Sequence, residues 1–202
     1  MELSGMISQY RIVALAKFSK EEQLLPTLGA LCSGGLPLVC VCPTAAVTKK
    51  GLTLAVNTFP DTVIGIRATS ADHAELACKC GVSFVCSPFF EKSIYDICSQ
   101  NDISYIPGAL TPSEVSSLLS LGLRTVILSP SRMIPDEAIS YCASLFPGVN
   151  FLIDCSDDPD RAVKAAALPG VIGALSPDII SSSLDKTVAN CIDLVGKLGN
   201  KQ

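Results

Sequence analysis

The sequence predicts a single (βα)8 barrel, the TIM-barrel fold of the α/β class, over residues 1–202. Short apolar segments alternate along the whole chain with segments of helical periodicity. The apolar segments are nearly continuous, which indicates strands with both faces buried, as in a parallel sheet. A chain of 202 residues suits one small barrel, and no linker divides it. The alternative is an open doubly wound sheet, but no G-x-G-x-x-G motif follows the first strand.

Each predicted strand is a short apolar run bounded by residues that favour turns. From the N-terminus the strands are 11–16, 38–42, 62–66, 83–86, a strand ending at Pro107-Gly108, 125–128, 150–154 and 171–174. Between them lie the predicted helices: 44–57, Ser70 to Gly81, a helix through 94–99, Thr111 to Gly122, 135–146, 159–167 and 181–198. Residues 1–9 are expected to form a lead-in of about one helical turn.

The helix starts carry capping signals. Ser19 and Glu22 have the spacing of a capping box, which predicts a helix from there to about Cys32. The signal is more complete in the stretch 106–130, where Thr111 precedes Pro112 and Glu114 follows two residues later. A capping hydroxyl, a proline at the first helical position and a glutamate reaching back to the cap together predict a helix start.

Composition excludes several classes of function. The formal net charge is -4 and no lysine or arginine cluster occurs, so we expect no nucleic-acid partner. No signal peptide and no apolar run of about 20 residues is evident, so we expect no membrane partner and a cytoplasmic location. A hydrophobic content of 49% against 17% charged residues favours a homo-oligomer. The ten cysteines are interpreted as reduced thiols packed in apolar surroundings.

Several motifs resemble the KDPG/KHG aldolase family (2-keto-3-deoxy-6-phosphogluconate and 4-hydroxy-2-oxoglutarate aldolases). The motifs are Gly34-Gly35-Leu36, Val63-Ile64-Gly65, Phe84-Val85-Cys86-Ser87-Pro88, Ile106-Pro107-Gly108 with Thr111-Pro112-Ser113-Glu114, and Phe146-Pro147-Gly148-Val149 before Phe151. The resemblance covers nearly the whole chain and implies the barrel fold, a trimer and aldehyde-lyase chemistry on 2-keto acids that yields pyruvate. In that chemistry a desolvated lysine forms a Schiff base and a glutamate moves protons.

The sequence departs from the family pattern at the positions that would do this chemistry. Ile127 stands where the resemblance puts the Schiff-base lysine, Cys40 where it puts the glutamate, and Thr44 where it puts an arginine. The arginine that ends the family's first strand falls on Ala16. Because Ala16 is then expected to face inward, Lys17 is expected to point outward.

The resemblance places the family's phosphate-holding segment on residues 152–158. The glycine pair of that segment is absent, and Asp157 and Asp158 stand at the expected anion site. We expect these two carboxylates to stabilise the helix start themselves and to repel a phosphate.

Other candidate residues fall at the carboxyl ends of the strands, where barrels of this type carry their sites. We predict that Arg67, Thr44, Ser129 and Asp154 bind a small anionic or keto-acid ligand. The more conservative interpretation of Arg67 is an ion pair with Asp154. No cofactor and no metal are predicted, since no Cys-x-x-Cys pair or partner histidine supports thiolate ligation.

These observations leave three functions open. The first is a diverged family member without Schiff-base chemistry, a pseudoenzyme that binds a small ligand or another protein. The second is an active keto-acid lyase with relocated catalytic groups. The third is a thiol- or metal-dependent enzyme that uses Cys40, Cys42 and Cys155. Whether the chain is an enzyme therefore stays open at this stage.

Overall fold

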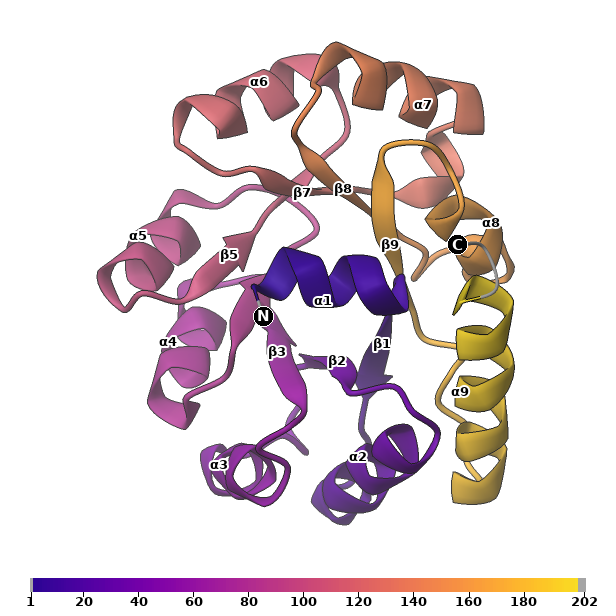
Figure 1. Cartoon of the computed structure of the whole chain (residues 1–202). Coiled ribbons are helices and arrows are strands. Elements are labelled where there is room, and N and C mark those ends of the chain that lie inside the picture. The colour runs from indigo at the N-terminus through magenta and orange to yellow at the C-terminus, as the bar shows by residue number, and fades with distance from the viewer. Residues whose placement is uncertain (1, 200–202) are drawn as a thin grey trace.

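The computed structural model describes residues 2–199 and confirms the barrel (Figure 1). Its strands are β1 (Ile12–Lys17), β2 (Leu38–Cys42), β3 (Val63–Arg67), β4 (Phe84–Cys86), β5 (Ser104–Ile106), β6 (Gly108–Ala109), β7 (Thr125–Leu128), β8 (Asn150–Asp154) and β9 (Val171–Ser176). All paired strands are parallel, in the order β5-β4-β3-β2-β1-β9-β8-β7-β6. The open doubly wound alternative is therefore wrong.

Pro107 explains why the two ends of this strand order are consecutive in the chain. Proline has no backbone N–H, so it breaks one barrel strand into β5 and β6. The first piece pairs with β4 and the second with β7. The carbonyl oxygen of Pro107 accepts the N–H of Ile127 at 2.9 Å, which continues the pairing across the break. The sheet therefore returns on itself and surrounds one core.

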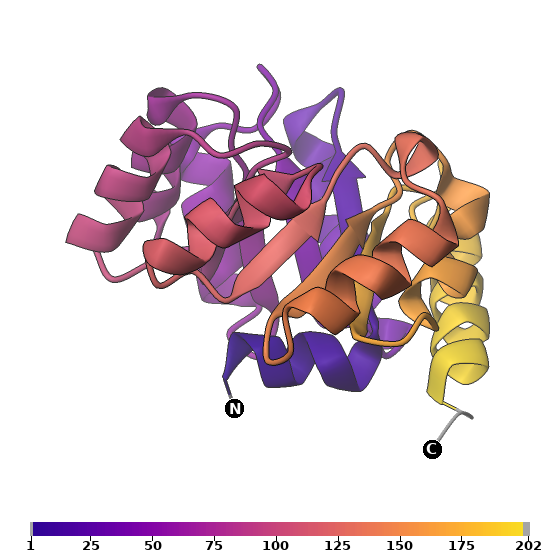
Figure 2. The same ribbon diagram turned by 90° about the horizontal axis from the view of Figure 1, so that it is seen from above.

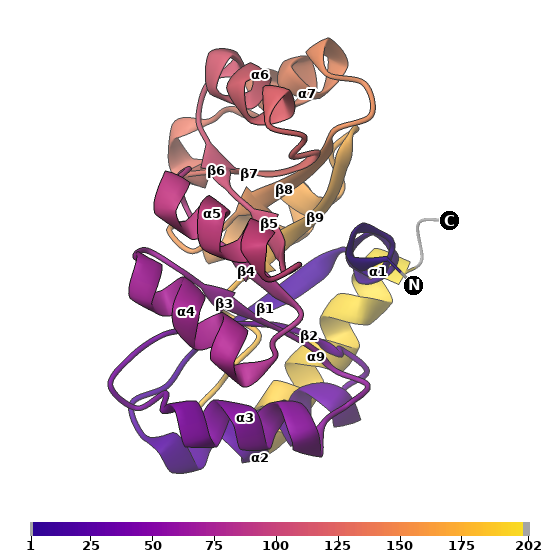
Figure 3. The same ribbon diagram turned by 90° about the vertical axis from the view of Figure 1, so that its left-hand side faces the viewer.

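The helices are α1 (Leu3–Tyr10), α2 (Leu24–Ser33), α3 (Lys49–Thr58), α4 (Ala71–Cys80), α5 (Lys92–Gln100), α6 (Pro112–Ser120), α7 (Asp136–Leu145), α8 (Ala162–Ala166) and α9 (Leu184–Gly199). Short 3-10 turns at Glu21–Gln23, Ser131–Met133 and Pro159–Arg161 precede α2, α7 and α8. Helices α2 to α7 surround the strands, and α9 lies beside α2 (Figure 3).

Helix α1 closes the amino-terminal end of the barrel. It lies across the strand ends in Figures 1 and 2 and contacts β1 and β9. Its Ile7 is fully buried. The helix has 8 residues, so the expectation of a single turn was too short. Arg11, which we expected to begin the first strand, has a left-handed conformation and ends α1 instead, and its side chain donates to the carbonyl of Val171 at 3.1 Å.

Two predicted helix starts were displaced because other side chains provide the caps. The oxygen of the Gln23 amide accepts the N–H groups of Ser19 and Lys20, both at 3.0 Å, so Gln23 replaces Glu22 in the first capping box. Thr48 caps α3 by accepting the N–H of Gly51 at 3.0 Å, and the segment from Thr44 to Thr48 is a loop. The capping box of Thr111 and Glu114 at α6 is confirmed.

Candidate functional site at the barrel mouth

Strand register determines which side chains face the inside of the barrel mouth. Arg67 must point inward, because its guanidinium reaches Asp154 on β8, on the opposite side of the barrel. Cys40 is in register with Gly65, two residues before Arg67, so Cys40 and Cys42 share its direction. Lys17 is in register with Cys42.

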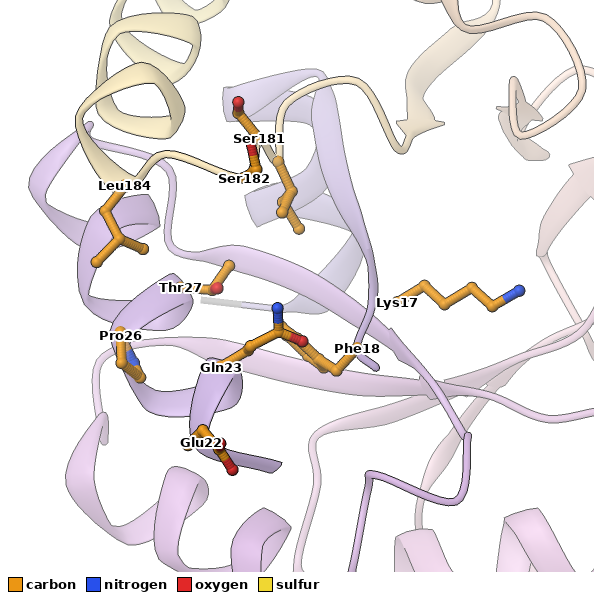
Figure 4. A pocket seen from close by; sticks show the side chains of 10 residues that line it. Lys17, Phe18, Glu22, Gln23, Pro26, Thr27, Ser181, Ser182 and Leu184 are labelled. Carbon is orange, nitrogen blue, oxygen red and sulfur yellow. The ribbon is translucent and has the colours of Figure 1, made fainter. Parts of the chain in front are cut away.

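Lys17 therefore faces inward by register, and the expectation that Ala16 holds the inward position was wrong. Ala16 is fully buried between the barrel and its helices, whereas Lys17 is exposed at the mouth. In Figure 4 the Lys17 side chain extends on the far side of Phe18, away from Thr27 and Ser182. The first strand thus ends in a cation at the mouth.

The centre of the mouth is occupied by a bidentate ion pair. Arg67 Nη1 donates to Asp154 Oδ1 at 3.1 Å, and Nη2 donates to Oδ2 at 2.6 Å. The side chains of Arg67 and Asp154 are only 16% and 2% exposed, so the pair is largely removed from water. Two parallel N–H···O bonds give the pair a defined geometry as well as energy. The conservative interpretation of Arg67 is confirmed.

Asp154 has further donors. Ser129 Oγ donates to Oδ2 at 3.0 Å, and the Ser156 N–H donates to Oδ1 at 3.1 Å. Burial opposes the charged form of the carboxylate, but Arg67 and Ser156 hold the pKa of Asp154 below its ordinary value. Likewise burial disfavours the charged Arg67, but Asp154 raises its pKa above the ordinary value. Both groups are therefore charged at neutral pH.

Below the ion pair the barrel interior carries no amine or carboxylate at the family positions. Ile127 is 2% exposed and in register with Leu152, two residues before Asp154, so it points inward. Cys40 is fully buried, and its Sγ lies 3.2 Å from that of Cys86. Burial raises the pKa of the Cys40 thiol well above its ordinary value, so it stays protonated and is a poor proton shuttle.

A glycine on β3, the strand between those of the two thiols, makes room for an aromatic side chain. A Cβ on Gly65 would come within 2.3 Å of the Phe84 ring, so only glycine leaves space for that ring inside the barrel.

The loops around the mouth use their own polar groups. Thr44 Oγ1 donates to the carbonyl of Phe18 at 2.9 Å and accepts the N–H of Ala46 at 3.3 Å, so it holds the β2–α3 loop. Asp157 accepts the Ser131 hydroxyl at 2.8 Å and the Arg132 N–H at 3.1 Å. Asp158 precedes the 3-10 turn at Pro159 without a side-chain cap. A carboxylate of the chain thus occupies backbone and hydroxyl donors that an anion could otherwise use.

The remaining cysteines and the histidine show packing and capping roles. Burial raises the pKa of Cys155 to about 12. Within residues 2–199 no group of three or more His, Cys, Asp or Glu side chains is arranged to hold a metal ion. His73 is half-buried in the first turn of α4 and accepts the Thr69 N–H at 3.2 Å. The third interpretation, a thiol or metal site, therefore gains no support from geometry.

Fold and site define the class of protein, a (βα)8 barrel with its polar groups gathered at the carboxyl ends of the strands, as in barrel enzymes. In the part of the chain that the structure describes, no helix is long and apolar enough to cross a membrane. The chain belongs to the KDPG and KHG aldolase family, whose family model matches residues 3–186.

Individual relatives agree with this assignment. A 2-dehydro-3-deoxy-phosphogluconate aldolase of Treponema pallidum (strain Nichols) is 22% identical over 148 residues, covering 72% of this chain and 70% of that protein. A KDPG aldolase of Zymomonas mobilis ZM4, solved with 3-phosphoglycerate, matches with a TM-score of 0.86 and 18% identity over 96% of this chain and 95% of that one. A KDPG aldolase of Legionella pneumophila, with pyruvate captured as a covalent carbinolamine, matches with a TM-score of 0.80 and 21% identity over 99% and 98%.

Sequence reasoning placed Arg67, Asp154 and Ser129 at the strand ends, where the structure brings them into contact, and their binding of a ligand stays a prediction. It missed Ser156 and misplaced Lys17. Ser156 was passed over because its contribution to Asp154 is a backbone N–H, which leaves no signal in residue type. Lys17 was assigned to the wrong side because strand parity was counted from Ala16. Counting from the inward Cys40 and Cys42 of the neighbouring strand would have placed Lys17 correctly.

Proposed function

We propose that this aldolase-family protein binds a small carboxylate, of the 2-keto-acid class, at the barrel mouth without forming a Schiff base at the family position. The observation that carries the proposal is the bidentate pair of Arg67 and Asp154, placed directly above Ile127. A guanidinium fork matches a carboxylate, and Asp154 occupies the position that a ligand carboxylate would take. The isoleucine below has no nucleophile. The binding requires no cofactor or metal.

The Arg67 guanidinium can move from Asp154 to a ligand carboxylate, because Asp154 has other hydrogen-bond donors besides Arg67. Ser129 and the N–H of Ser156 continue to donate to the carboxylate when the guanidinium leaves. Lys17 and Arg67 supply two cations against one inward carboxylate. That balance favours a small anion at the mouth. Thr44 stays a predicted ligand residue, although its hydroxyl is engaged within its loop.

Thermal unfolding in the presence of pyruvate tests this proposal. We expect millimolar pyruvate to raise the melting temperature of the wild type. The melting temperature of Arg67→Gln should be the same with and without pyruvate. Arg132→Gln is the matched control, because Arg132 is exposed and makes no side-chain ion pair within residues 2–199. If pyruvate raises the melting temperature of Arg67→Gln as much as that of the wild type, Arg67 does not belong to the site.

The second candidate is a keto-acid lyase with relocated groups, and the inward register of Lys17 favours it. In this reading the Lys17 amine attacks the keto carbonyl from the rim of the barrel. Pyruvate with borohydride, followed by intact-mass measurement, separates the two candidates. The first predicts no adduct. A stoichiometric adduct that is lost in Lys17→Met supports the second and contradicts the first.

We also propose that the protein is a cytoplasmic homotrimer. The family resemblance implies the trimer, and large apolar side chains on the surface support self-association. Met133, Tyr141 and Ile192 are 68%, 62% and 59% exposed. Light scattering at micromolar concentration tests the assembly, and a monomeric mass contradicts it.

A further inference from the structure

A second cavity lies outside the mouth, at the rim between the β1–α2 segment and the β9–α9 loop (Figure 4). Its volume is about 430 Å³, within the range of small-molecule sites. Phe18, Gln23 and Thr27 line one side, and Ser181, Ser182 and Leu184 line the other. Lys17, at the end of β1, also lines the cavity, whereas Arg67 and the segment 154–158 do not, so the cavity adjoins the mouth at Lys17.

Thr27 presents an unused hydroxyl to this cavity. The residue is only 6% exposed, and its hydroxyl makes no hydrogen bond within residues 2–199. Every fully enclosed polar side-chain atom in that range has a partner, so the Thr27 hydroxyl must open to the cavity that it lines. A ligand atom in the cavity can therefore form a hydrogen bond with this hydroxyl, worth about 0.5–1.5 kcal/mol.

Gln23 adds two N–H donors with a determined orientation. Its Oε1 already accepts the N–H groups of Ser19 and Lys20 at 3.0 Å and the Ser19 hydroxyl at 3.1 Å. Because these bonds occupy the oxygen, the amide cannot turn over. In Figure 4 the Gln23 nitrogen points toward the loop that carries Ser181 and Ser182.

The opposite wall combines hydroxyls with the start of a long helix. Helix α9 has 16 residues, and its first N–H groups have no carbonyl partner in the helix, although Ser183 Oγ accepts that of Lys186 at 3.5 Å. Ser181 and Ser182 directly precede this end, which carries the positive pole of the helix dipole. The nearest carboxylate of the lining, Glu22, is exposed and points away from the serines (Figure 4). Donors therefore dominate the facing surfaces.

We propose that this rim cavity binds the oxyanion of a small phosphate monoester. The Thr27 hydroxyl, the Gln23 amide and the hydroxyls of Ser181 and Ser182 donate to the phosphate oxygens, together with the start of α9. Phe18 and Leu184 contact the organic part of the molecule, for which the cavity leaves room. The Lys17 ammonium, which also lines the cavity, adds a positive charge to these neutral donors, whereas Arg67 takes no part.

Titration with glycerol 3-phosphate tests the proposal, with glycerol and inorganic phosphate as parallel probes. We expect saturable binding of both phosphate-containing probes, no binding of glycerol, and affinity about tenfold weaker in Thr27→Val. Ser182→Ala, at an exposed position, should also weaken binding without altering the fold. Thr58→Val is the matched control, because its exposed hydroxyl lies on α3 and bonds the Leu54 carbonyl.

Amide chemical shifts give a second, independent measurement. Bound glycerol 3-phosphate should shift the amide signals of Thr27, Ser182 and Asp185 and leave those of Arg67 and Ser156 unchanged. Equal affinities of wild type, Thr27→Val and Ser182→Ala overturn the proposal. So does a failure of both phosphate probes to bind, or a set of shifted amides centred on the mouth.

Discussion

The barrel mouth and the rim cavity differ in how their polar groups are satisfied. At the mouth, Arg67 and Asp154 neutralise each other, and Ser129 and Ser156 complete the carboxylate. At the rim, the Thr27 hydroxyl and the Gln23 amide face open space. The mouth contributes to stability without a ligand, whereas the rim has donors in reserve. Position at the strand ends therefore does not by itself indicate a ligand site. Hydrogen-bonding groups without a protein partner are the more informative sign.

The largest expected effect comes from breaking the mouth pair. Asp154→Ala leaves a mostly buried guanidinium without its carboxylate, so we expect the free energy of unfolding to fall by about 3–5 kcal/mol. Chemical denaturation measures this loss. Asp160→Ala, at an exposed site, is the control and should change stability by less than about 0.5 kcal/mol.

The double variant Arg67→Met/Asp154→Leu sharpens the result. Replacing both charges with apolar side chains should recover much of the loss, since no buried charge is then left alone. Equal stability losses for the double and the single variant would show that the pair is not energetically coupled.

The next largest effect on stability is expected at Ile127, in the barrel interior below the ion pair. Ile127→Lys introduces an amine at a position that is 2% exposed, so we expect a loss of at least about 2 kcal/mol in the free energy of unfolding. Aldol cleavage should remain absent, because Cys40 cannot replace a carboxylate as proton shuttle. The measurements are denaturation and pyruvate release from KDPG. Turnover by this single variant would contradict the argument that the chemistry also requires a carboxylate at the position of Cys40.

Acid should weaken the mouth pair in a defined direction. The pKa of Asp154 is lower in the folded protein than its value of about 3.9 in the unfolded chain. The unfolded state therefore binds more protons between the two values, and stability falls as pH falls through that window. Unfolding measured between pH 2 and 5 should show a shallower pH dependence in Asp154→Asn. Glu75, Glu114 and Asp136, whose pKa values are also lowered, contribute to the slope that remains.

The smallest effects on stability are expected from substitutions that remove a threonine hydroxyl, at Thr111 and at Thr27. Thr111 has its hydroxyl engaged in the α6 capping box, so Thr111→Ala should cost about 1 kcal/mol. Within residues 2–199 the Thr27 hydroxyl has no partner, so the shape-conserving Thr27→Val should change stability by less than about 0.5 kcal/mol. Thermal unfolding of both variants checks the contrast. A clear loss in Thr27→Val would mean that its hydroxyl is not available to a ligand.

Local chemistry was enough to predict most elements. The strands 38–42, 125–128 and 150–154 match the structure because apolar runs end at turn residues there. Helices α4 and α6 begin and end at their predicted caps, Ser70 with Gly81 and Thr111 with Gly122 nearby. The starts of α2 and α3 were displaced, since several serine, threonine and glutamate side chains competed for the capping role and only the folded loop selected among them.

The sequence by itself determined the alternation of strands and helices, the family and the absence of an amine at Ile127, because these depend on residue identity and short-range order. Only the tertiary structure decided that Arg67 pairs with Asp154 across 87 positions of sequence and that Lys17 faces the mouth. It also decided that the Thr27 hydroxyl has no hydrogen-bond partner among the described residues. Each of these depends on strand register and barrel closure, which bring distant side chains together and which no local pattern encodes.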